Sequence, residues 1–212
     1  MIKLLSLLNE LNIKPKTPIG SGMYHTAFPF EKFKDKIIKT GKGDVDISSG
    51  GVKKINQKPL NKKMLDIFQR FPKFFAHVYK ITDKYAVIQK LDTEAFKSDS
   101  FKLARGLIRL VMSEPRFAKN NTLLYPYAIN PSLEPEDIDI SYFIYFLTFS
   151  RNYRLGKKLR KYLPRDIFDK FYDFFKALDQ SGVKNYLPRN RADVHENNLG
   201  YDKEGNLKFL DI

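Results

Sequence analysis

The chain has 212 residues, of which 42% are hydrophobic and 14% aromatic, and it contains no cysteine. This length and composition predict a globular domain of two small lobes, and they exclude a disordered chain, a disulfide framework and a thiolate metal site. The net charge of +14, from 38 basic and 24 acidic residues, predicts attraction to polyanions.

The first part of the chain predicts one helix and three strands. Apolar residues recur at helical spacing in residues 2–11, and strands are expected near 16–20, 24–30 and 34–40. The segment PIGSGMYHTAF (18–28) is typical of a strand, a Gly-rich turn and a second strand. Its turn residues would let the backbone approach phosphates, which a Cβ would obstruct. We therefore assign nucleotide binding to three of them: Gly20, Ser21 and Gly22. Taken alone, the G-x-G pattern is equally typical of an ordinary hairpin turn.

The third strand carries Lys39, which is otherwise one of many surface lysines. Residues 41–59 are rich in Gly, Ser, Asp and Lys and predict a mobile connection. A helix is expected from Pro59 to Arg70, because the residue before Pro72 avoids helical angles. Strands at 73–80 and 84–90 then complete a five-stranded antiparallel sheet.

The second half of the chain predicts helices and a final hairpin. The helices are expected at 98–112, with Ser98 or Asp99 as N-cap, at 136–150 and at 165–181. Residues 138–149 are so aromatic that they must be buried or face a partner, whereas the aromatic stripe of 165–181 is typical of a core. The hairpin covers 199–212, with its turn at 203–206.

A cluster of polar residues near the end of the chain suggests phosphoryl transfer. Asp193 lies in the segment DVHENN (193–198), Asn198 follows five positions later, and Asp211 comes after the hairpin. Phosphoryl transfer needs a carboxylate that accepts the hydroxyl proton, and an amide with a second carboxylate that hold Mg²⁺. His195 could act as an acid or base, or order the loop by hydrogen bonding.

In this order of Gly-turn, strand lysine and Asp…Asn…Asp, the chain resembles the protein-kinase-like superfamily. The resemblance covers roughly residues 15–212 and is closest to the atypical bacterial and phage branch, which is aminoglycoside-phosphotransferase-like. The chain departs from the family at several motif positions. His25 and Ala27 replace the loop's third glycine and a valine, Arg191-Ala192 precede Asp193, and only Ile212 follows Asp211.

The resemblance implies a role for each motif. Lys39 would contact the α- and β-phosphates, Asn198 and Asp211 would bind Mg²⁺, and Asp193 would be the catalytic base. Residues 86–94 would be the hinge, where the backbone near Gln89 and Leu91 binds adenine. The family's lysine-pairing glutamate is absent from the helix after the third strand, where Asp66 is the only acidic candidate. Asp66 is also typical of a helix-surface charge flanked by lysines. The second lobe would lack the segments that follow the metal-binding aspartate in the family.

We therefore predict an α+β, protein-kinase-like fold in two lobes. Residues 1–90 form a five-stranded antiparallel N-lobe with one helix, and residues 91–212 form a reduced, mainly helical C-lobe. The protein would bind Mg-ATP in the cleft between the lobes and transfer a phosphoryl group to a hydroxyl of an unknown protein or small molecule.

Two other functions stay open. One is an inactive pseudokinase or structural binding module that serves a partner protein. The other is a basic nucleic-acid-binding protein that contacts polyanions through residues 53–63 and 151–162. The absence of cysteine fits a reducing cytoplasm, and the Lys/Asn-rich composition suits a phage or bacterium, so we expect a cytoplasmic protein (in the host cytoplasm if viral). No apolar run is long enough to span a membrane.

Overall fold

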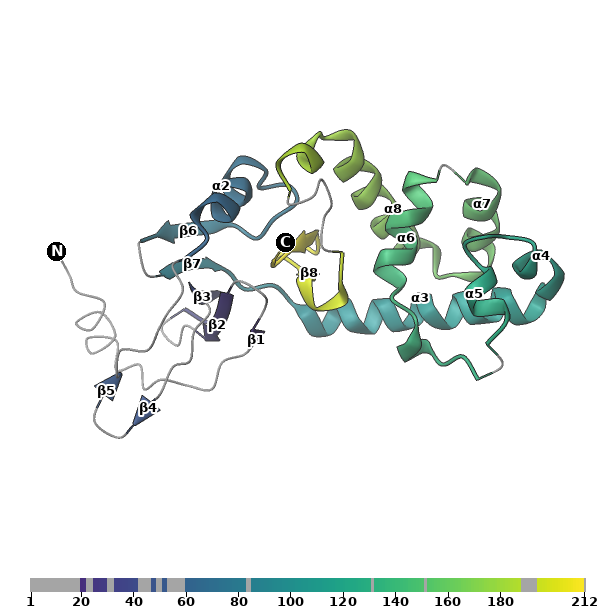
Figure 1. Ribbon diagram of the computed structural model, residues 1–212, viewed down its shortest axis with the longest axis horizontal. Helices are drawn as coiled ribbons and strands as arrows, with labels where there is room; N and C mark the ends of the chain where they lie inside the picture. The colour runs from purple at the N-terminus through teal and green to yellow at the C-terminus, as the bar shows by residue number, and fades with distance from the viewer. Residues whose placement is uncertain are drawn as a thin grey trace. The chain divides into compact units, whose positions relative to one another are not determined.

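The computed structural model describes residues 20–21, 25–29, 33–41, 47–48, 51–52, 60–82, 85–130, 132–150, 152–187 and 194–211. The chain divides into two compact units, residues Met1–Leu91 and Asp92–Ile212. The first unit contains an antiparallel sheet and the second is mainly helical (Figure 1). The predicted mixture of helices with an antiparallel sheet is therefore confirmed.

The sheet of unit 1 has the strand order β1-β2-β3-β7-β6. Its longer strands are β2 (His25–Pro29), β3 (Lys36–Gly41), β7 (Tyr85–Gln89) and β6 (Val78–Ile81), and β1 (Gly20–Ser21) adds two paired residues at one edge. All neighbours are antiparallel, and β3 lies in the middle, between β2 and β7. A separate pair consists of β4 (Ile47–Ser48) and β5 (Gly51–Val52), within the predicted connection.

Helix α2 (Lys62–Arg70) contacts β6 and supplies much of the core of unit 1. Its residues Leu65 and Phe68 have no exposed surface, and the Phe68 ring stacks on Phe75 with centroids 4.7 Å apart. Burying one such aromatic ring stabilises the fold by about 1.5–3 kcal/mol. This packing fixes the helix against the sheet.

Two element boundaries in unit 1 differ from the prediction. Helix α2 begins at Lys62 rather than Pro59, because the Asn61 side chain caps it by accepting a hydrogen bond from Met64 N at 3.3 Å. The expected strand at 73–80 begins only at Val78. Residues 72–74 form a turn instead, closed by a bond from Phe74 N to Phe71 O.

Unit 2 is built on the long helix α3 (Thr93–Ser113), which contacts most of the other elements of the unit. The elements that follow are α4 (Pro115–Lys119), α5 (Tyr125–Ala128), η1 (Pro135–Asp137), α6 (Ile140–Phe149), α7 (Tyr153–Tyr162), α8 (Arg165–Gln180), η2 (Val183–Tyr186), η4 (Glu196–Asn198), β8 (Leu199–Tyr201) and β9 (Leu207–Phe209). The predicted aromatic core stripe of α8 is confirmed, since Phe168, Phe171 and Phe175 are buried.

Sequence reasoning placed the start of two helices of unit 2 wrongly. Helix α3 begins five residues before the predicted 98–112, because Asp92 rather than Ser98 or Asp99 is its N-cap and accepts a bond from Ala95 N at 2.9 Å. The expected helix at 136–150 is interrupted. A short 3-10 turn ends at Asp137, and Asp139 then caps α6 through Tyr142 N at 3.0 Å.

Helices α3 and α7 approach each other closely at Gly106. A Cβ added there would lie 2.9 Å from Tyr162 O and 3.0 Å from Leu163 Cγ, closer than side chains can pack. The glycine therefore sets how near the end of α7 comes to the long helix.

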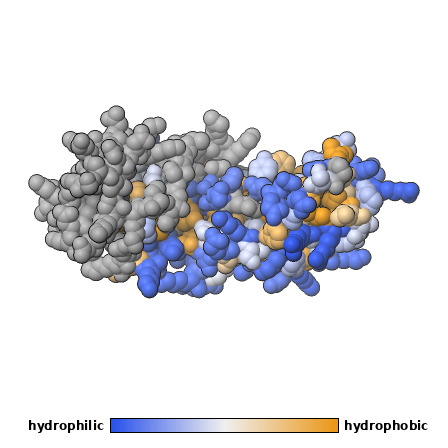
Figure 2. All heavy atoms as spheres, turned by 90° about the horizontal axis from the view of Figure 1, so that it is seen from below, coloured by the Kyte–Doolittle hydropathy of each residue, from blue (hydrophilic) through white to orange (hydrophobic). Residues whose placement is uncertain are grey.

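Among the residues drawn in colour in Figure 2, hydrophilic side chains predominate, and the hydrophobic ones gather in smaller groups.

Candidate functional site

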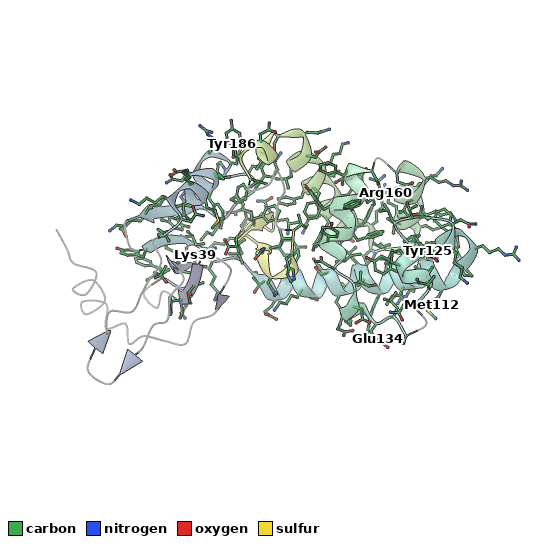
Figure 3. The ribbon with its side chains drawn as sticks, in the orientation of Figure 1. Lys39, Met112, Tyr125, Glu134, Arg160 and Tyr186 are labelled. Atoms are coloured by element: carbon green, nitrogen blue, oxygen red, sulfur yellow. The ribbon has the colours of Figure 1, made fainter. Side chains whose placement is uncertain are left out.

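Lys39 lies on the middle strand of the sheet in unit 1, with only 4% of its surface exposed (Figure 3). Its direct cross-strand neighbours are Ala27 on β2 and Ala86 on β7. Residues in direct register point to the same face of a sheet, so two small side chains flank the lysine. The Lys39 ammonium group lies 5.8 Å from the centre of the Phe68 ring. Lysine is rarely buried unless its charge is compensated, so this position is unusual for a merely structural residue.

The Gly-rich segment is described only in part. Gly20 and Ser21 lie in β1, paired with Ala27 and Thr26. They are thus paired strand residues directly before the predicted turn, and their role in nucleotide binding stays a prediction. Gly22 lies outside the described residues.

The residues predicted to bind adenine, Gln89 and Leu91, lie at and just after the end of β7. Gln89 N donates to His77 O at 2.7 Å, and Lys90 N donates to Asp35 O at 2.8 Å. The Gln89 side chain accepts a bond from His77 N at 3.2 Å and so holds the strand. These contacts engage two of the three backbone amides of residues 89–91. In the part of the chain that the structure describes, the Leu91 amide has no hydrogen-bond partner.

Asp66 does not face the buried lysine. It is exposed on α2, two residues before the buried Phe68, and positions two apart on a helix point in nearly opposite directions. The ammonium of Lys39 lies on the Phe68 side. The helix thus supplies no equivalent of the glutamate that pairs with the lysine in the kinase-like family.

The predicted catalytic loop is described from Val194 onward, and Asp193 lies outside the described residues. His195 is the N-cap of η4, where its Nδ1 accepts a hydrogen bond from Asn197 N at 3.3 Å. Of the two roles considered for this histidine, loop ordering is therefore the one that the structure supports. Asn198 follows as the last residue of the turn.

The hairpin predicted at 199–212 is confirmed, and it brings Asn198 and Asp211 to the same end of one element. Leu199 on β8 pairs with Phe209 on β9. Leu210 N then donates to Asn198 O at 2.7 Å, which extends the ladder by one step. Asp211 follows directly, so the backbones of Asn198 and Asp211 lie at adjoining positions at the open end of the hairpin.

The turn of this hairpin is fixed by the buried carboxylate of Asp202. One of its oxygens accepts bonds from Glu204 N at 3.1 Å and Asn206 N at 2.8 Å, and the other accepts from Asn206 Nδ2 at 3.1 Å. The ammonium of Lys208 lies 3.6 Å from the second oxygen. Gly205 has a φ of 79°, which favours glycine. These contacts set the register that positions the open end.

Tyr201 anchors the hairpin to α3. Its backbone exchanges hydrogen bonds with Asp92, at 2.7 and 3.1 Å, and its hydroxyl donates to Asp99 Oδ2 at 3.0 Å. Its ring packs edge-on against Phe96, with centroids 6.1 Å apart. Burial, and then the hydrogen bond to Asp99, raise the pKa of Tyr201.

Sequence reasoning did not identify Asp202, Tyr201 or the role of Asp99. The segment DKEGN (202–206) carried a usable signal for the first, because Asp, Gly and Asn are the residues that stabilise tight turns through side-chain bonds and positive φ. The tyrosine contact joins residues 102 positions apart, so no local pattern could reveal it.

Within the described residues, no three His, Cys, Asp or Glu side chains gather in a way that could hold a metal ion. In that same part of the chain, no helix has both the length and the apolar character needed to cross a bilayer. Comparisons with protein-family models, with curated proteins and with solved structures found no match.

Proposed function

We propose that the protein is a kinase-like phosphotransferase that binds Mg-ATP and phosphorylates a hydroxyl group. Lys39 contacts the α- and β-phosphates, Asn198 and Asp211 bind the metal, and Asp193 is the base. Gly20, Ser21 and Gly22 lie over the phosphates, and the backbone of Gln89 to Leu91 binds the adenine.

The observation that carries this proposal is the open end of the β8–β9 hairpin. The bond from Leu210 N to Asn198 O aligns the amide residue with the residue that precedes Asp211. Carboxylate and amide oxygens are the ligands that Mg²⁺ prefers, and Mg²⁺ usually takes only one or two carboxylates from a protein and its other oxygens from water and phosphates. Two protein ligands at the end of one hairpin suit that requirement.

The buried position of Lys39 supports the same function. A lysine between two alanines in the middle of a sheet has its charge held at a fixed point, with small neighbours on either side. Phosphoryl transfer is catalysed mostly by such fixed charges and by positioning, because the transition state carries its negative charge on phosphate oxygens.

In the reaction, the chain's residues align the phosphates and accept a proton. Asp193 accepts the proton of the acceptor hydroxyl as that oxygen bonds to the terminal phosphorus and the bond to the ADP oxygen breaks. Lys39 holds the phosphates that remain with ADP. Bound Mg-ATP supplies the phosphoryl group and the metal charge that offsets the phosphates.

A thermal-shift titration with Mg-ATP tests the binding step. A ligand at a hundred times its dissociation constant adds about 2.7 kcal/mol to the free energy of unfolding, because it binds only the folded state. Lys39→Met and Asp211→Ala should each reduce the shift. The matched controls Lys36→Met, on the same strand but the other face, and Asp173→Ala, exposed on α8, should keep it. If saturating nucleotide leaves the melting curve unchanged with and without Mg²⁺, the proposal is wrong.

The catalytic step needs a second assay, in which ATP turnover and nucleotide affinity are measured for the same variants. Asp193→Ala should abolish turnover and leave affinity nearly intact, since the base acts on the acceptor, whereas Asp211→Ala should reduce both. Full turnover by Asp193→Ala would contradict the assignment of the base and leave His195 as the residue to test.

One observation favours a second candidate, a pseudokinase that binds nucleotide without transferring phosphate. The only acidic residue of α2 is Asp66, which is exposed, so the helix offers no carboxylate to hold Lys39 in the position that catalysis needs. The two functions separate in the assays above: the pseudokinase gives the thermal shift but no turnover with any acceptor.

A further inference from the structure

Helix α7 carries five cations and no acidic residue in its ten positions. Its apolar side is buried, since Leu155 and Leu159 have no exposed surface and the helix contacts α3 and α8. The cations therefore lie on the remaining surface of the helix, and one of them, Arg160, is labelled in Figure 3.

Two of the five cations are neutralised by neighbours. Lys158 forms an ion pair with Glu114, which also accepts a hydrogen bond from the Tyr162 hydroxyl at 2.9 Å. Arg160 donates to Asp169 at 2.8 Å. These pairs hold α7 in place and leave the other three cations to be explained.

The other three, Arg154, Lys157 and Lys161, are exposed and form no ion pair with any described residue. Their spacing of three and four residues places them on one face of the helix, over a length of roughly 10 Å. The carboxylates of Glu114 and Asp169 are already engaged, so the face keeps its positive charge.

Helix α4 extends this positive face. Phe117 on α4 lies under Arg154 and Lys158 of α7, with ring distances of 5.8 and 4.3 Å, so the two helices are neighbours. Helix α4 adds the exposed cations Arg116 and Lys119. We define the α4–α7 basic face as these five side chains: Arg116, Lys119, Arg154, Lys157 and Lys161.

We propose that the α4–α7 basic face binds the phosphate backbone of nucleic acid without sequence preference. A DNA strand presents one phosphate per about 3.4 Å of axis, so three cations spread over roughly 10 Å of helix can each approach a phosphate. Long lysine and arginine side chains can reach phosphates along the backbone, and neutralising the phosphates releases counterions. The overall charge of +14 favours the encounter.

The burial of the apolar side of α7 argues against a lipid surface as the occupant. A helix that lies on a membrane inserts its apolar side chains between the lipids, whereas Leu155 and Leu159 are buried within unit 2. A nucleic acid needs only the cations. The proposal is independent of nucleotide binding, because none of these residues belongs to the site described above.

Fluorescence anisotropy with a short labelled DNA duplex, without ATP, tests the proposal. The intact protein should bind with an affinity that falls steeply between about 50 and 200 mM salt. The triple variant Arg154→Gln, Lys157→Gln, Lys161→Gln should bind at least about tenfold more weakly, and its log–log salt slope should be smaller by about 2 to 3, since each duplex phosphate contact contributes about 0.9.

A control variant that loses the same charge elsewhere distinguishes DNA binding by this face from an effect of the protein's net charge. Lys63, Lys73 and Lys90 are exposed in unit 1, and their triple change to Gln should leave the salt slope close to that of the intact protein. Equal losses in both triple variants, or no duplex binding by the intact protein at about 50 mM salt, would overturn the proposal. Binding to anionic vesicles or polyglutamate that the first triple variant loses, with duplex binding kept, would also overturn it.

Circular dichroism and melting curves show whether both triple variants are folded. We expect them to be, because all six substituted side chains are exposed. The single variant Lys157→Glu provides a second route, since it should weaken duplex binding further than Lys157→Gln does. Mg-ATP binding by the first triple variant should be unchanged, so failure of the DNA test and failure of the proposed kinase-like site can be told apart.

Discussion

Lys39 and the pair Asn198–Asp211 are predicted to serve the same reaction, but the chain holds them in different ways. Lys39 is an interior residue of a middle strand, and hydrogen-bond ladders to β2 and β7 fix its backbone. The pair occupies the end of a hairpin with strands of only three residues. Its position depends on a few side chains, above all Asp202 and Tyr201.

The two halves of the proposed site should therefore respond differently to a single substitution. A ladder continues through many backbone groups, so changing one side chain should leave the strand in place. The short hairpin has few backbone pairs, so a lost side-chain contact changes the register or leaves buried groups unpaired. The substitutions below test this contrast by their effect on the free energy of unfolding.

The largest effect is expected for Asp202→Ala. It leaves two backbone amides and the Asn206 side chain without this acceptor, and it removes one ion-pair partner of Lys208. The loss should be about 3 kcal/mol, because breaking a buried, hydrogen-bonded carboxylate site is strongly destabilising. Asp202→Asn keeps one acceptor oxygen and should lose less. Chemical denaturation measures the free energy of unfolding of both variants. If the Ala variant is as stable as the intact protein, the hairpin does not depend on the Asp202 side chain.

Gly106→Ala tests the packing of helix α3, which contacts both α7 and β8 of the hairpin. The new Cβ would meet Tyr162 O at 2.9 Å, and such overpacking should exceed the gain in helix propensity and cost about 2 kcal/mol. The matched control is Gly156→Ala on α7, where no atom lies within 4 Å. That change should raise stability by about 0.5–1 kcal/mol. Stabilisation by both changes would contradict the close contact at Gly106.

Tyr201→Phe removes the bond to Asp99 and should cost about 1 kcal/mol at neutral pH. The pKa of Tyr201 is raised in the folded protein above its ordinary 10.0, so above that pH the unfolded chain releases a proton that the folded protein keeps. The contribution of Tyr201 is therefore complete below about pH 10 and is lost as the pH rises further. Unfolding curves should show the gap between the two proteins narrowing above pH 10, and a widening gap would refute the assignment.

The smallest effect is expected for Lys39→Met. Methionine fills a similar volume without charge, and the ladders on both sides of β3 remain, so the free energy of unfolding should change by less than about 1 kcal/mol. A loss as large as that of Asp202→Ala would show that the sheet depends on this side chain and would remove the contrast between the two regions.

The sequence predicted the elements that are specified by a local pattern of residues. The stripe of α8, the hairpin with its turn at 203–206 and the strand that carries Lys39 follow from hydrophobic periodicity and turn composition. The backbone bond from Leu210 to Asn198, next to that hairpin, was not predicted. Asp193 and Gly22 lie outside the described residues, and their roles stay predictions.

The parts that sequence reasoning missed depend on competition between similar residues. Asp92, Ser98 and Asp99 are all good caps for α3, and the choice of Asp92 is coupled to its backbone pairing with Tyr201, far along the chain. Asp66, by contrast, is exposed on the predicted helix, as expected for a surface charge flanked by lysines, while Phe68 on the same helix packs against Phe75.

The backbone pairing of Asp92 with Tyr201 also has a consequence for how the protein folds on the ribosome. It joins the first residues of unit 2 to its last strand pair, and Phe96 on the same helix stacks on Phe171 at 5.3 Å as well as meeting Tyr201. Helix α3 is therefore synthesised long before the segments that cover its first turns. Until Phe171 and then Tyr201 emerge from the ribosome, the Phe96 side chain lacks these contacts and is exposed. During this interval the nascent chain is most prone to aggregate or to need a chaperone.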